Sequence, residues 1–365
     1  MSLFNPGMRC NDLGPDITKI ENRMNLSHRK LLVCCLCAPP VSAQFWFLEN
    51  RGYYNPALAE PRAAQTQVMF PVDMSSFPFA VNPGRNVGWE ITLGHEFPVL
   101  GYDSNPIGNK DTGTAAGAWA VGLWFPVSFH MIEDLTKDPS SPILNVDYRF
   151  SGMLKAQYGL RDKGGSHVGF RFQFGHESTH IGDEFTLGAL RTHPADFLRV
   201  NVSYQYYDMG GSYEPNFGRF QFKFRGGDIW LWDPAEGWYS RDVLQPYGEF
   251  IAGSKRNHEP YFESELYVEP KGSSKLGWLA SVDVRDRTIY QYNVVANANF
   301  TNPEEPTQWS VNVMAGLRQN RIGTGILGKV RPTYYLRYYH GVNPNGQFRS
   351  QKNFQLYGFG VQFGF

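Results

Sequence analysis

The feature of this sequence that most constrains its fold is a regular alternation of large apolar and small or polar residues along the C-terminal segment. Within residues 353–365 the large apolar side chains occupy every second position: Tyr357, Phe359, Val361, Phe363 and Phe365. Glycine or glutamine fills the positions between them. Because successive side chains of a β-strand point to opposite faces, this segment predicts a strand with one aromatic face.

The same two-residue period recurs in segments that share alternating apolar and polar residues: 168–174, 198–206, 220–224, 276–284 and 309–317. In one of them Tyr204 and Tyr206 fall in the apolar set, which we expect to face lipid. A soluble β-sandwich would alternate in the same way. The connections, however, alternate between long ones such as 181–196 and short ones such as 254–259, and this asymmetry is typical of outer-membrane barrels.

The composition supports a membrane barrel. Aromatic residues make up 15% of the 365 residues, whereas charged residues make up only 19%. No run reaches the roughly 18 to 20 apolar residues of a membrane helix. We therefore predict an all-β protein in which residues 66–365 form a transmembrane antiparallel β-barrel of 12 to 14 strands, with long extracellular loops and short periplasmic turns. The strands near 66–70 and 290–300 are the weakest in the pattern.

The N-terminal region has the features of a secretory signal. Residues 25–30 are basic, residues 31–38 are apolar, and small residues precede a cut that we expect before Gln44. Met24 directly precedes this signal, so residues 1–43 are expected to be an upstream extension, wrongly included at the start, plus a signal peptide. All four cysteines lie before the cut, as suits a Gram-negative envelope protein without disulfides. Residues 44–65 are expected to form an N-terminal lead or a plug.

Residues 176–180 read HESTH and match the HExxH signature of zinc metalloproteases. That signature requires a helix, which brings both histidines to one ion. Here Phe170, Phe172 and Phe174 alternate just before it and predict a strand, on which the two histidines would lie about 13 Å apart. We therefore expect no metal and no cofactor at this motif.

On such a strand His176, Ser178 and His180 continue the lipid-facing set, at the extracellular edge. His176 and Ser178 would be same-face neighbours about 6.6 Å apart, within reach of a hydrogen bond when the side chains lean together. The imidazole could then activate the hydroxyl toward an ester. The ring could be oriented by Asp183 or Glu184 just above it, or by Asn145 or Asp196 on flanking segments. The alternative is an interfacial cluster, capped by the same acidic residues, that holds the following loop.

The His-x-Ser pair resembles outer membrane phospholipase A, a twelve-stranded barrel with such a pair on its lipid-facing wall, and is similar to that of the lipid A deacylases. The resemblance implies hydrolysis of lipid acyl esters in the outer leaflet by a serine esterase. It also implies an orienting Asn on the adjoining strand, to which no residue here can be matched, although Asn343 or Asn345 would serve if their loop folded toward Ser178. No calcium ligand can be matched either, and calcium stays open as an alternative.

A broader resemblance rests on GHESTHIGDEF, RYYHGVNPNGQFRSQ and the C-terminal strand. Together they are similar to a family of bacterial outer-membrane barrels classed as a domain of unknown function, which implies a barrel over most of the chain and no activity. The aromatic C-terminus also resembles the recognition signal of such barrels. The expected location is the cell outer membrane, and the expected partners are its lipids and, through Phe365, the barrel assembly machinery.

The opposite face of the predicted strands carries charges of both signs. We expect the lumen to contain Arg199, Arg219, Lys223, Arg225, Asp283 and Arg285. Such charges could line a narrow channel that favours anionic solutes, or form a salt-bridge network that closes the barrel. A passive channel, or porin, and a structural barrel without catalysis are therefore the alternatives to the hydrolase. With 34 basic and 34 acidic residues, the chain gives no indication of nucleic-acid binding.

Overall fold

The structure is a computed structural model that describes fourteen stretches of the chain: residues 44–48, 56–72, 88–105, 115–135, 143–162, 165–182, 199–232, 237–240, 250–251, 258–271, 275–289, 307–319, 330–349 and 351–364. The predicted signal, its cysteines and Phe365 lie outside them. The compact unit that contains the barrel begins at Gln44.

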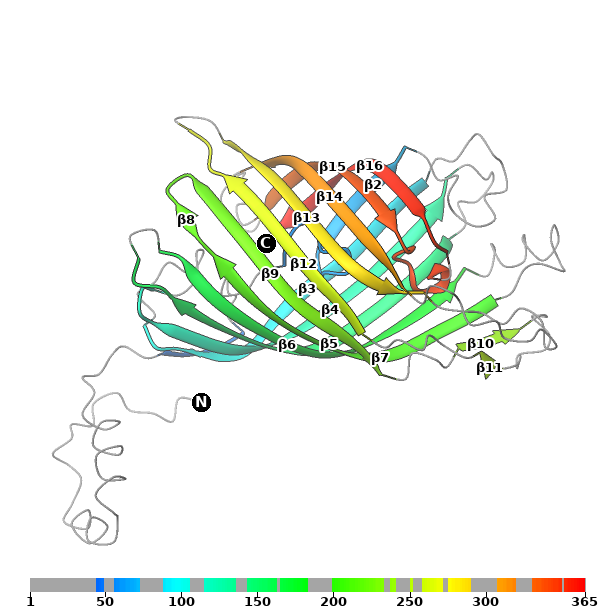
Figure 1. The fold of residues 1–365 in the computed structure, drawn as a ribbon, viewed down its shortest axis with the longest axis horizontal. Coiled ribbons are helices and arrows are strands. Elements are labelled where there is room, and N and C mark those ends of the chain that lie inside the picture. The colour runs from blue at the N-terminus through cyan, green and yellow to red at the C-terminus, as the bar shows by residue number, and fades with distance from the viewer. Residues whose placement is uncertain are drawn as a thin grey trace, which may run out of the picture. The chain divides into compact units, whose positions relative to one another are not determined.

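Twelve strands close an antiparallel barrel (Figure 1). They are β2 (Thr66–Pro71), β3 (Gly88–Asp103), β4 (Trp119–Asp134), β5 (Ile143–Gly159), β6 (His167–Ile181), β7 (Arg199–Glu214), β9 (Phe220–Trp232), β12 (His258–Val268), β13 (Leu276–Thr288), β14 (Thr307–Gln319), β15 (Arg331–Gly341) and β16 (Phe354–Gly364). The pairing of β16 with β2, in which Phe359 lies opposite Phe70, joins the last strand to the first. The prediction of a barrel of 12 to 14 strands is confirmed with twelve.

Four short strands lie outside this ring. β1 (Gln44–Phe47) pairs with β3, and β8 (Asn216–Phe217) pairs with β9. β10 (Gly237–Ser240) pairs with the first residues of β7 on one side and with β11 (Phe250–Ile251) on the other. The predicted short turn at 254–259 is wrong, because His258 begins β12 opposite Trp230 and so lies at the end of the barrel that carries the long link 233–257. The reason is that the pattern had implied one strand that crosses the barrel between residues 242 and 254, whereas β11 pairs with β10 outside the ring. The expected strand near 290–300 lies outside the described residues.

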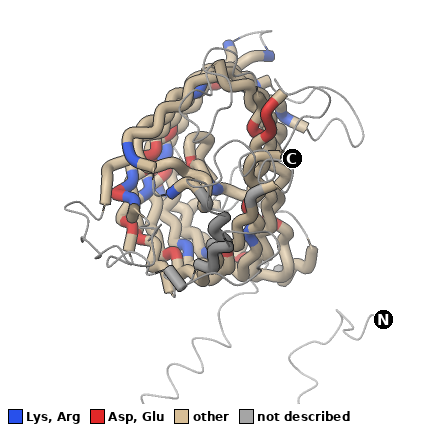
Figure 2. The backbone as a smooth tube through the Cα atoms, turned by 90° about the vertical axis from the view of Figure 1, so that its right-hand side faces the viewer, with Lys and Arg blue, Asp and Glu red and all other residues tan. Residues whose placement is uncertain are grey.

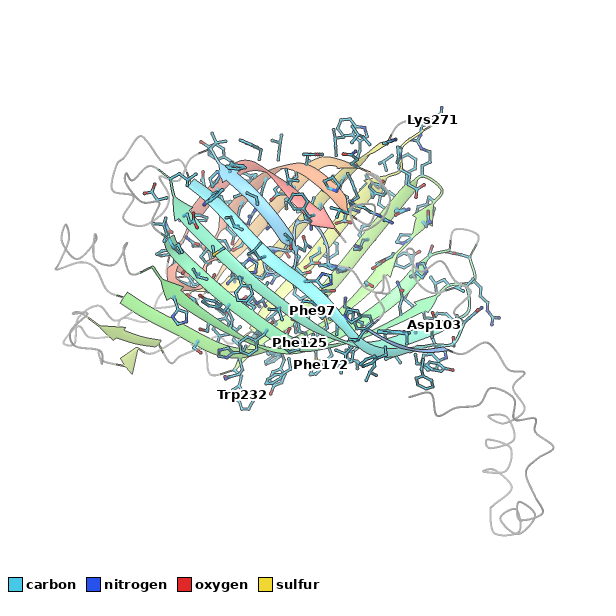
Figure 3. All side chains as sticks on the ribbon, turned by 180° about the vertical axis from the view of Figure 1, so that it is seen from behind. Phe97, Asp103, Phe125, Phe172, Trp232 and Lys271 are labelled. Carbon is cyan, nitrogen blue, oxygen red and sulfur yellow. The ribbon has the colours of Figure 1, made fainter. Side chains whose placement is uncertain are left out.

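The outer wall is apolar, as a lipid-facing surface requires. The large side chains of Phe97, Phe125 and Trp232 are 46 to 57% exposed and lie on the outside of the barrel (Figure 3). Trp278, on the opposite wall, is 68% exposed. No helix in the described part of the chain is both long and apolar enough to cross a membrane.

The two ends of the barrel differ. The end at which β16 finishes carries short links such as 160–166 and 269–275. The opposite end carries longer links such as 233–257 and 289–306. The long link ahead of β7 and the last residues of β6 lie at this second end, which we call the long-loop end.

The lumen contains two further segments of the chain. Residues 56–65, here called the lumen segment, lie inside the barrel just before β2 begins. Leu58 and Ala59 pack there in an apolar cluster with side chains of the inner wall, among them Met69 and Met314. Residues 342–349, here called the inward loop, follow β15 and are buried from Val342 to Gly346 and again at Phe348 and Arg349.

Candidate functional site

The HESTH motif lies on β6, a strand as predicted, and its two sides serve different surroundings. Glu177 and Thr179 are buried in the lumen, with 2% and 0% of their surface exposed. His176, Ser178 and His180 face outward near the last residues of β6. The alternation inherent in a strand thus splits five consecutive residues into an outer row and an inner pair.

The outer row, meaning His176, Ser178 and His180, contains two His–Ser contacts. Ser178 Oγ lies 2.9 Å from His180 Nε2. His176 Nε2 lies 3.4 Å from the Oγ of Ser203, which stands on β7 directly opposite Ser178. The structure therefore brings Ser178 together with His180 and pairs His176 with Ser203, whereas the sequence had suggested a His176–Ser178 pair.

The outer row borders a hollow in the barrel wall of about 430 Å³. Its other lining side chains come from β4 and β5 and include Phe129, Tyr148 and Phe150. The Tyr148 ring meets the His180 ring edge-on at 5.6 Å, and Phe150 lies 5.1 Å from the His176 ring. His180 thus lies between Ser178 on its own strand and the Tyr148 ring on β5, and His176 lies between Ser203 on β7 and the Phe150 ring on β5.

The predicted orienting groups for the imidazole can be placed only in part. Asp183, Glu184 and Asp196 lie outside the described residues. Asn145 does not approach the outer row, because it is buried in the lumen, where it donates to Asp147 at 2.8 Å. The hypothesis that Asn343 or Asn345 approaches Ser178 is wrong, because both are buried on the lumen side of the wall. The physical reason is that their amides bond to each other and to Gln351. Asn345 Nδ2 donates to Asn343 Oδ1 at 3.0 Å, and Asn343 Nδ2 donates to Gln351 Oε1 at 2.9 Å.

The inner pair contacts the lumen segment. Arg62 of that segment forms ion pairs with Glu177 and, at 2.7 Å, with Asp147 of β5. Arg149, also on β5, lies 3.0 Å from Glu177 and donates to the Arg62 carbonyl. Because all of these groups are buried, their charges depend on one another for compensation.

Further contacts hold the lumen segment to strands from across the barrel. The Leu58 amide donates to Glu265 at 2.7 Å, and the Ala59 amide donates to Ser281 Oγ at 3.1 Å. Asn312 of β14 donates to the Ala59 carbonyl at 2.6 Å. On β3, Gly94 leaves the space for the segment, since a Cβ there would lie 2.9 Å from the Ala64 backbone.

Glu60 is the acidic centre of the lumen segment. Its carboxylate lies 3.1 Å from Arg171 and 3.8 Å from Arg225. Burial alone would raise the pKa of the Glu60 carboxyl, but Arg171, Arg225 and other arginines together outweigh it and hold the pKa below its ordinary value. Glu60 is therefore ionised at neutral pH.

The inward loop is held in the lumen by the same kind of contact. Arg349 forms an ion pair with Glu259 and donates to Thr288 Oγ1 at 3.0 Å. The Gly346 amide donates to Asp147 at 3.2 Å. Asp147 thus accepts from both the lumen segment and the inward loop. Gly346 also approaches Thr179, since a Cβ at Gly346 would lie 2.3 Å from the Thr179 side chain, so the two sequence motifs that we had linked to one family meet inside the barrel.

The residues that we expected in the lumen lie in two kinds of surroundings. Lys223, Arg225, Asp283 and Arg285 stand on the inner face, where Arg285 lies 2.9 Å from Asp283. Charged positions of both signs follow the barrel wall in Figure 2. Arg219, by contrast, is exposed in the turn before β9, where it donates to the Glu269 carbonyl at 2.7 Å. The prediction fails there because the turn begins later than the alternation suggested.

The alternation of β7 is opposite to the one we expected. Tyr204 and Tyr206 are buried in the lumen, with 4% and 1% of their surface exposed, whereas Ser203 is exposed on the outer wall. Arg199 belongs to the first residues of β7, whose side chains lie outside the description. This reversal places Ser203 beside the outer row, which the sequence pattern had missed.

Little open space is left beside the lumen segment. A cavity of about 20 Å³ lies there, bordered by Glu60, Arg171 and Arg285 among others. This volume accommodates about one water molecule. Beside this cavity the lumen contains the lumen segment and side chains of the wall that form ion pairs with it.

Known proteins resemble this chain in sequence family and in overall architecture. A family model described as a protein of unknown function, DUF1207, matches residues 42–243. No curated protein matches the sequence.

Solved structures that are similar to the chain are outer-membrane barrels. The transport unit of the autotransporter AIDA-I from Escherichia coli is 11% identical, with 86% of this chain and 94% of that chain covered and a TM-score of 0.42. An active-site mutant of outer membrane phospholipase A from Escherichia coli is 12% identical, with the same coverage and a TM-score of 0.40. The translocator domain of the autotransporter NalP from Neisseria meningitidis is 11% identical, covers 96% and 97% of the two chains and has a TM-score of 0.39. At these sequence identities and TM-scores, no activity of those proteins is assigned to this chain.

Proposed function

The chain belongs to the DUF1207 family of proteins of unknown function, a membership that assigns no activity, and from the site geometry we propose that it is an outer-membrane serine esterase that hydrolyses acyl esters of outer-leaflet lipids. One observation carries the proposal. Ser178 Oγ and His180 Nε2 lie 2.9 Å apart on the lipid-facing wall. A serine within hydrogen-bond reach of an imidazole is the minimal arrangement for nucleophilic catalysis.

The chemistry follows from that contact. His180 Nε2 accepts the Ser178 hydroxyl proton while Ser178 Oγ bonds to the ester carbonyl carbon. The tetrahedral intermediate then collapses, the ester C–O bond breaks, and the departing alcohol takes the proton from His180. Water, deprotonated by the same nitrogen, hydrolyses the acyl-serine, releases the fatty acid and restores the hydroxyl. His180 must therefore carry its resting proton on Nδ1, which Asp183 or Glu184 would hold.

The location of the site also suits a lipid substrate. Polar and ionisable side chains are costly on the lipid-facing wall of a barrel except near its interfaces. The outer row lies close to the end of β6, at the long-loop end, which we take to be extracellular because outer-membrane barrels carry their longer loops on that side. There an ester at the head-group level would meet Ser178 from the outer leaflet.

The contents of the lumen favour this function over a passive channel. The lumen segment and the inward loop both occupy the interior, and Arg62, Glu60 and Arg349 tie them to the wall through buried ion pairs. We expect no conductance steps from the wild-type protein in planar bilayers over a wide voltage range. Regular steps would favour the channel.

The hydrolase is tested by fatty-acid release. The full chain, purified in detergent, is incubated with dipalmitoyl phosphatidylethanolamine in mixed micelles. We expect release by the wild type, none by Ser178→Ala, and a rate about 10²- to 10⁴-fold lower for His180→Ala, the range that general-base catalysis contributes. His176→Ala should retain most of the rate, since its imidazole contacts Ser203.

Two substitutions serve as matched controls. Ser264→Ala removes an outer-wall serine of β12, and His95→Ala removes an outer-wall histidine of β3 that packs on Phe97 at 4.8 Å. Neither should lower the rate. Absence of release by the wild type, or release that Ser178→Ala leaves intact, would exclude the esterase.

A further inference from the structure

The hollow beside the outer row has a polar rim and an apolar remainder. Ser178, His176 and His180 on β6 form the rim. Val127 and Phe129 on β4 and Tyr148 and Phe150 on β5 supply most of the rest. The site therefore offers a reactive hydroxyl at one side and a hydrocarbon surface beside it.

Strand register fixes how this surface is laid out. Phe129 pairs with Tyr148, which in turn pairs with Ser178, so one row of side chains crosses three strands. Val127, Phe150 and His176 form the parallel row next to it. With strands about 4.8 Å apart, the hollow extends roughly 10 Å from Ser178 to β4.

Val127 creates the depth of the hollow. Val127 stands on the outer face of β4 between Phe125 and Phe129, which are 46% and 39% exposed. Its shorter side chain is less exposed than either phenyl ring. A valine between two protruding phenyl rings leaves a gap that is bounded on the β5 side by Phe150, 48% exposed. This gap lies diagonally across from Ser178.

We propose that this hollow seats the acyl chain of the lipid whose ester meets Ser178, so that the substrates are long-chain lipid esters and Val127 limits the chain that fits. This inference rests on the proposed function. An acyl chain is the occupant that matches the site, because the wall faces hydrocarbon, the lining carries aromatic and aliphatic side chains, and the polar groups gather where an ester would lie. The lipid itself supplies such a chain within the membrane.

Selection in such a seat comes from shape. A chain in the bilayer is already surrounded by hydrocarbon, so it gains packing contacts rather than removal from water. A tryptophan at position 127 would occupy the gap and displace the chain while leaving Ser178 and His180 in place. Outer-wall positions of a barrel accept large aromatic residues.

The first readout is chain-length dependence. Hydrolysis of 4-nitrophenyl acetate and of 4-nitrophenyl palmitate is measured in the same detergent micelles for the wild type, Val127→Trp and Val168→Trp. Val168 is the matched control, an outer-wall valine, 37% exposed, near the other end of β6. Val127→Trp should lower the palmitate rate about tenfold or more, as loss of methylene contacts in a pocket does, and change the acetate rate less than about twofold. Val168→Trp should change neither.

The second readout does not need activity. The protein is placed in vesicles of palmitoyl-oleoyl phosphatidylcholine that contain a phosphatidylcholine with a diazirine in its acyl chain. After illumination, peptides that contain Val127 and Phe150 should carry several-fold more label than the peptide around Phe262 on the opposite wall, and Val127→Trp should remove the excess.

The two readouts separate the two proposals. Excess labelling at the hollow without any hydrolysis would support the seat and exclude the esterase. Hydrolysis in which Val127→Trp lowers both esters equally or neither, with uniform labelling, would overturn the seat and leave the esterase standing. A dimer in native mass spectrometry that Val127→Trp dissociates would assign the hollow to a second copy of the chain and would also overturn the proposal.

Discussion

Arg62→Ala should release the lumen segment from the barrel wall without unfolding the barrel. Arg62 is 7% exposed and is the cation that joins the segment to Asp147 and Glu177. Glu177 keeps Arg149 at 3.0 Å, so the substitution leaves only Asp147 without its cation. Asp147 also keeps the amide donors of Asn145 and Gly346.

The free energy lost in Arg62→Ala can be estimated from these contacts. Breaking a buried ion pair by removing one partner costs about 3 to 5 kcal/mol, and the remaining donors to Asp147 place this case at the lower end. A loss of about 3 kcal/mol in the free energy that holds the segment corresponds to about a 10²-fold larger open population, since about 1.4 kcal/mol is a factor of ten. Arg62→Lys should show a smaller change, because lysine retains the charge but lacks the planar fork.

The assay is hydrogen exchange measured by mass spectrometry on the peptide that contains residues 56–65. The Leu58 and Ala59 amides donate to side chains of the wall, so they exchange only when the segment leaves it. We expect their exchange to be about 10²-fold faster in Arg62→Ala. Lys155→Ala is the matched control, because Lys155 is a buried lumen cation paired with Glu96 of the wall and not with the segment.

Two results would refute this reasoning. Exchange of the Leu58 and Ala59 amides in Arg62→Ala that stays within a factor of about three of the wild type would mean that Arg62 does not hold the segment. An equal rise in the strand peptides, or in Lys155→Ala, would mean that the effect is global destabilisation and not local release.

Three further predictions concern the lumen. The folded-state pKa of Glu60 lies below its ordinary value of 4.5, so its contribution to holding the segment is present at neutral pH and is lost as the pH falls through 4.5 and below. Hydrogen exchange of the segment, corrected for intrinsic rates, should therefore rise at low pH. Glu60→Gln should flatten this pH dependence. Gly94→Val should crowd the Ala64 backbone and weaken the binding of the lumen segment to the wall by about 1 to 3 kcal/mol, which would be seen as faster hydrogen exchange. Gly152→Val is the control, because it has open space around it and should leave exchange unchanged. Equal exchange in both variants would contradict the close approach of Gly94 to Ala64. Arg349→Ala should free the inward loop, because loss of the ion pair with Glu259 costs about 3 to 5 kcal/mol of the free energy that holds the loop in the lumen. We expect trypsin to cleave the variant near Lys352, where the wild type resists. Resistance of the variant would show that other contacts hold the loop.

The barrel was predictable because the face on which a strand residue lies is a local property. On β6 the alternation of Phe170, Phe172 and Phe174 was enough to place His176 and Ser178 outside and Glu177 inside. The alternation at the C-terminus predicted β16 in the same way. Each inference needed only the two-residue period of a strand and no knowledge of its neighbours.

The failures arose where local pattern is ambiguous. Tyr204 and Tyr206 were expected on the lipid side, yet a tyrosine has an apolar ring and a polar hydroxyl and suits either face. Inside the barrel the Tyr206 hydroxyl accepts from Gln173 at 3.1 Å, and Arg149 lies over its ring at 4.7 Å. Gly175 opposite provides the space, since a Cβ there would lie 2.6 Å from that hydroxyl.

The partner of Ser178 could not be read from the sequence either. His176 and His180 are both two residues away on the same face, so their spacing is equal. Which imidazole meets the hydroxyl depends on how the side chains lean along the strand and on Ser203, which engages His176 from β7. The position of Ser203 follows from strand register, and register is a property of the closed sheet.

For the lumen segment, local inference reached only the two alternatives of a lead or a plug over residues 44–65, although its composition held a further signal. Glu60 and Arg62 stand among Ala57, Ala59 and Ala63, and small residues with isolated opposite charges suit a segment threaded through a narrow charged interior. The partners of these charges are Arg171, Asp147 and Glu177, which lie about 85 to 115 residues away in the chain. Only closure of the barrel brings them together.

From the dependence of these contacts on barrel closure we expect a definite order of events during biogenesis. The anchors of residues 56–65 come from β6, β9, β12 and β14, so they are complete only when the C-terminal strands are in place and β16 has paired with β2. In a half-formed barrel the same arginines and carboxylates would be without their partners, and the N-terminal residues would have nowhere to dock. Docking of this segment should therefore be the final step of maturation and a marker by which a completed molecule can be told from a stalled one.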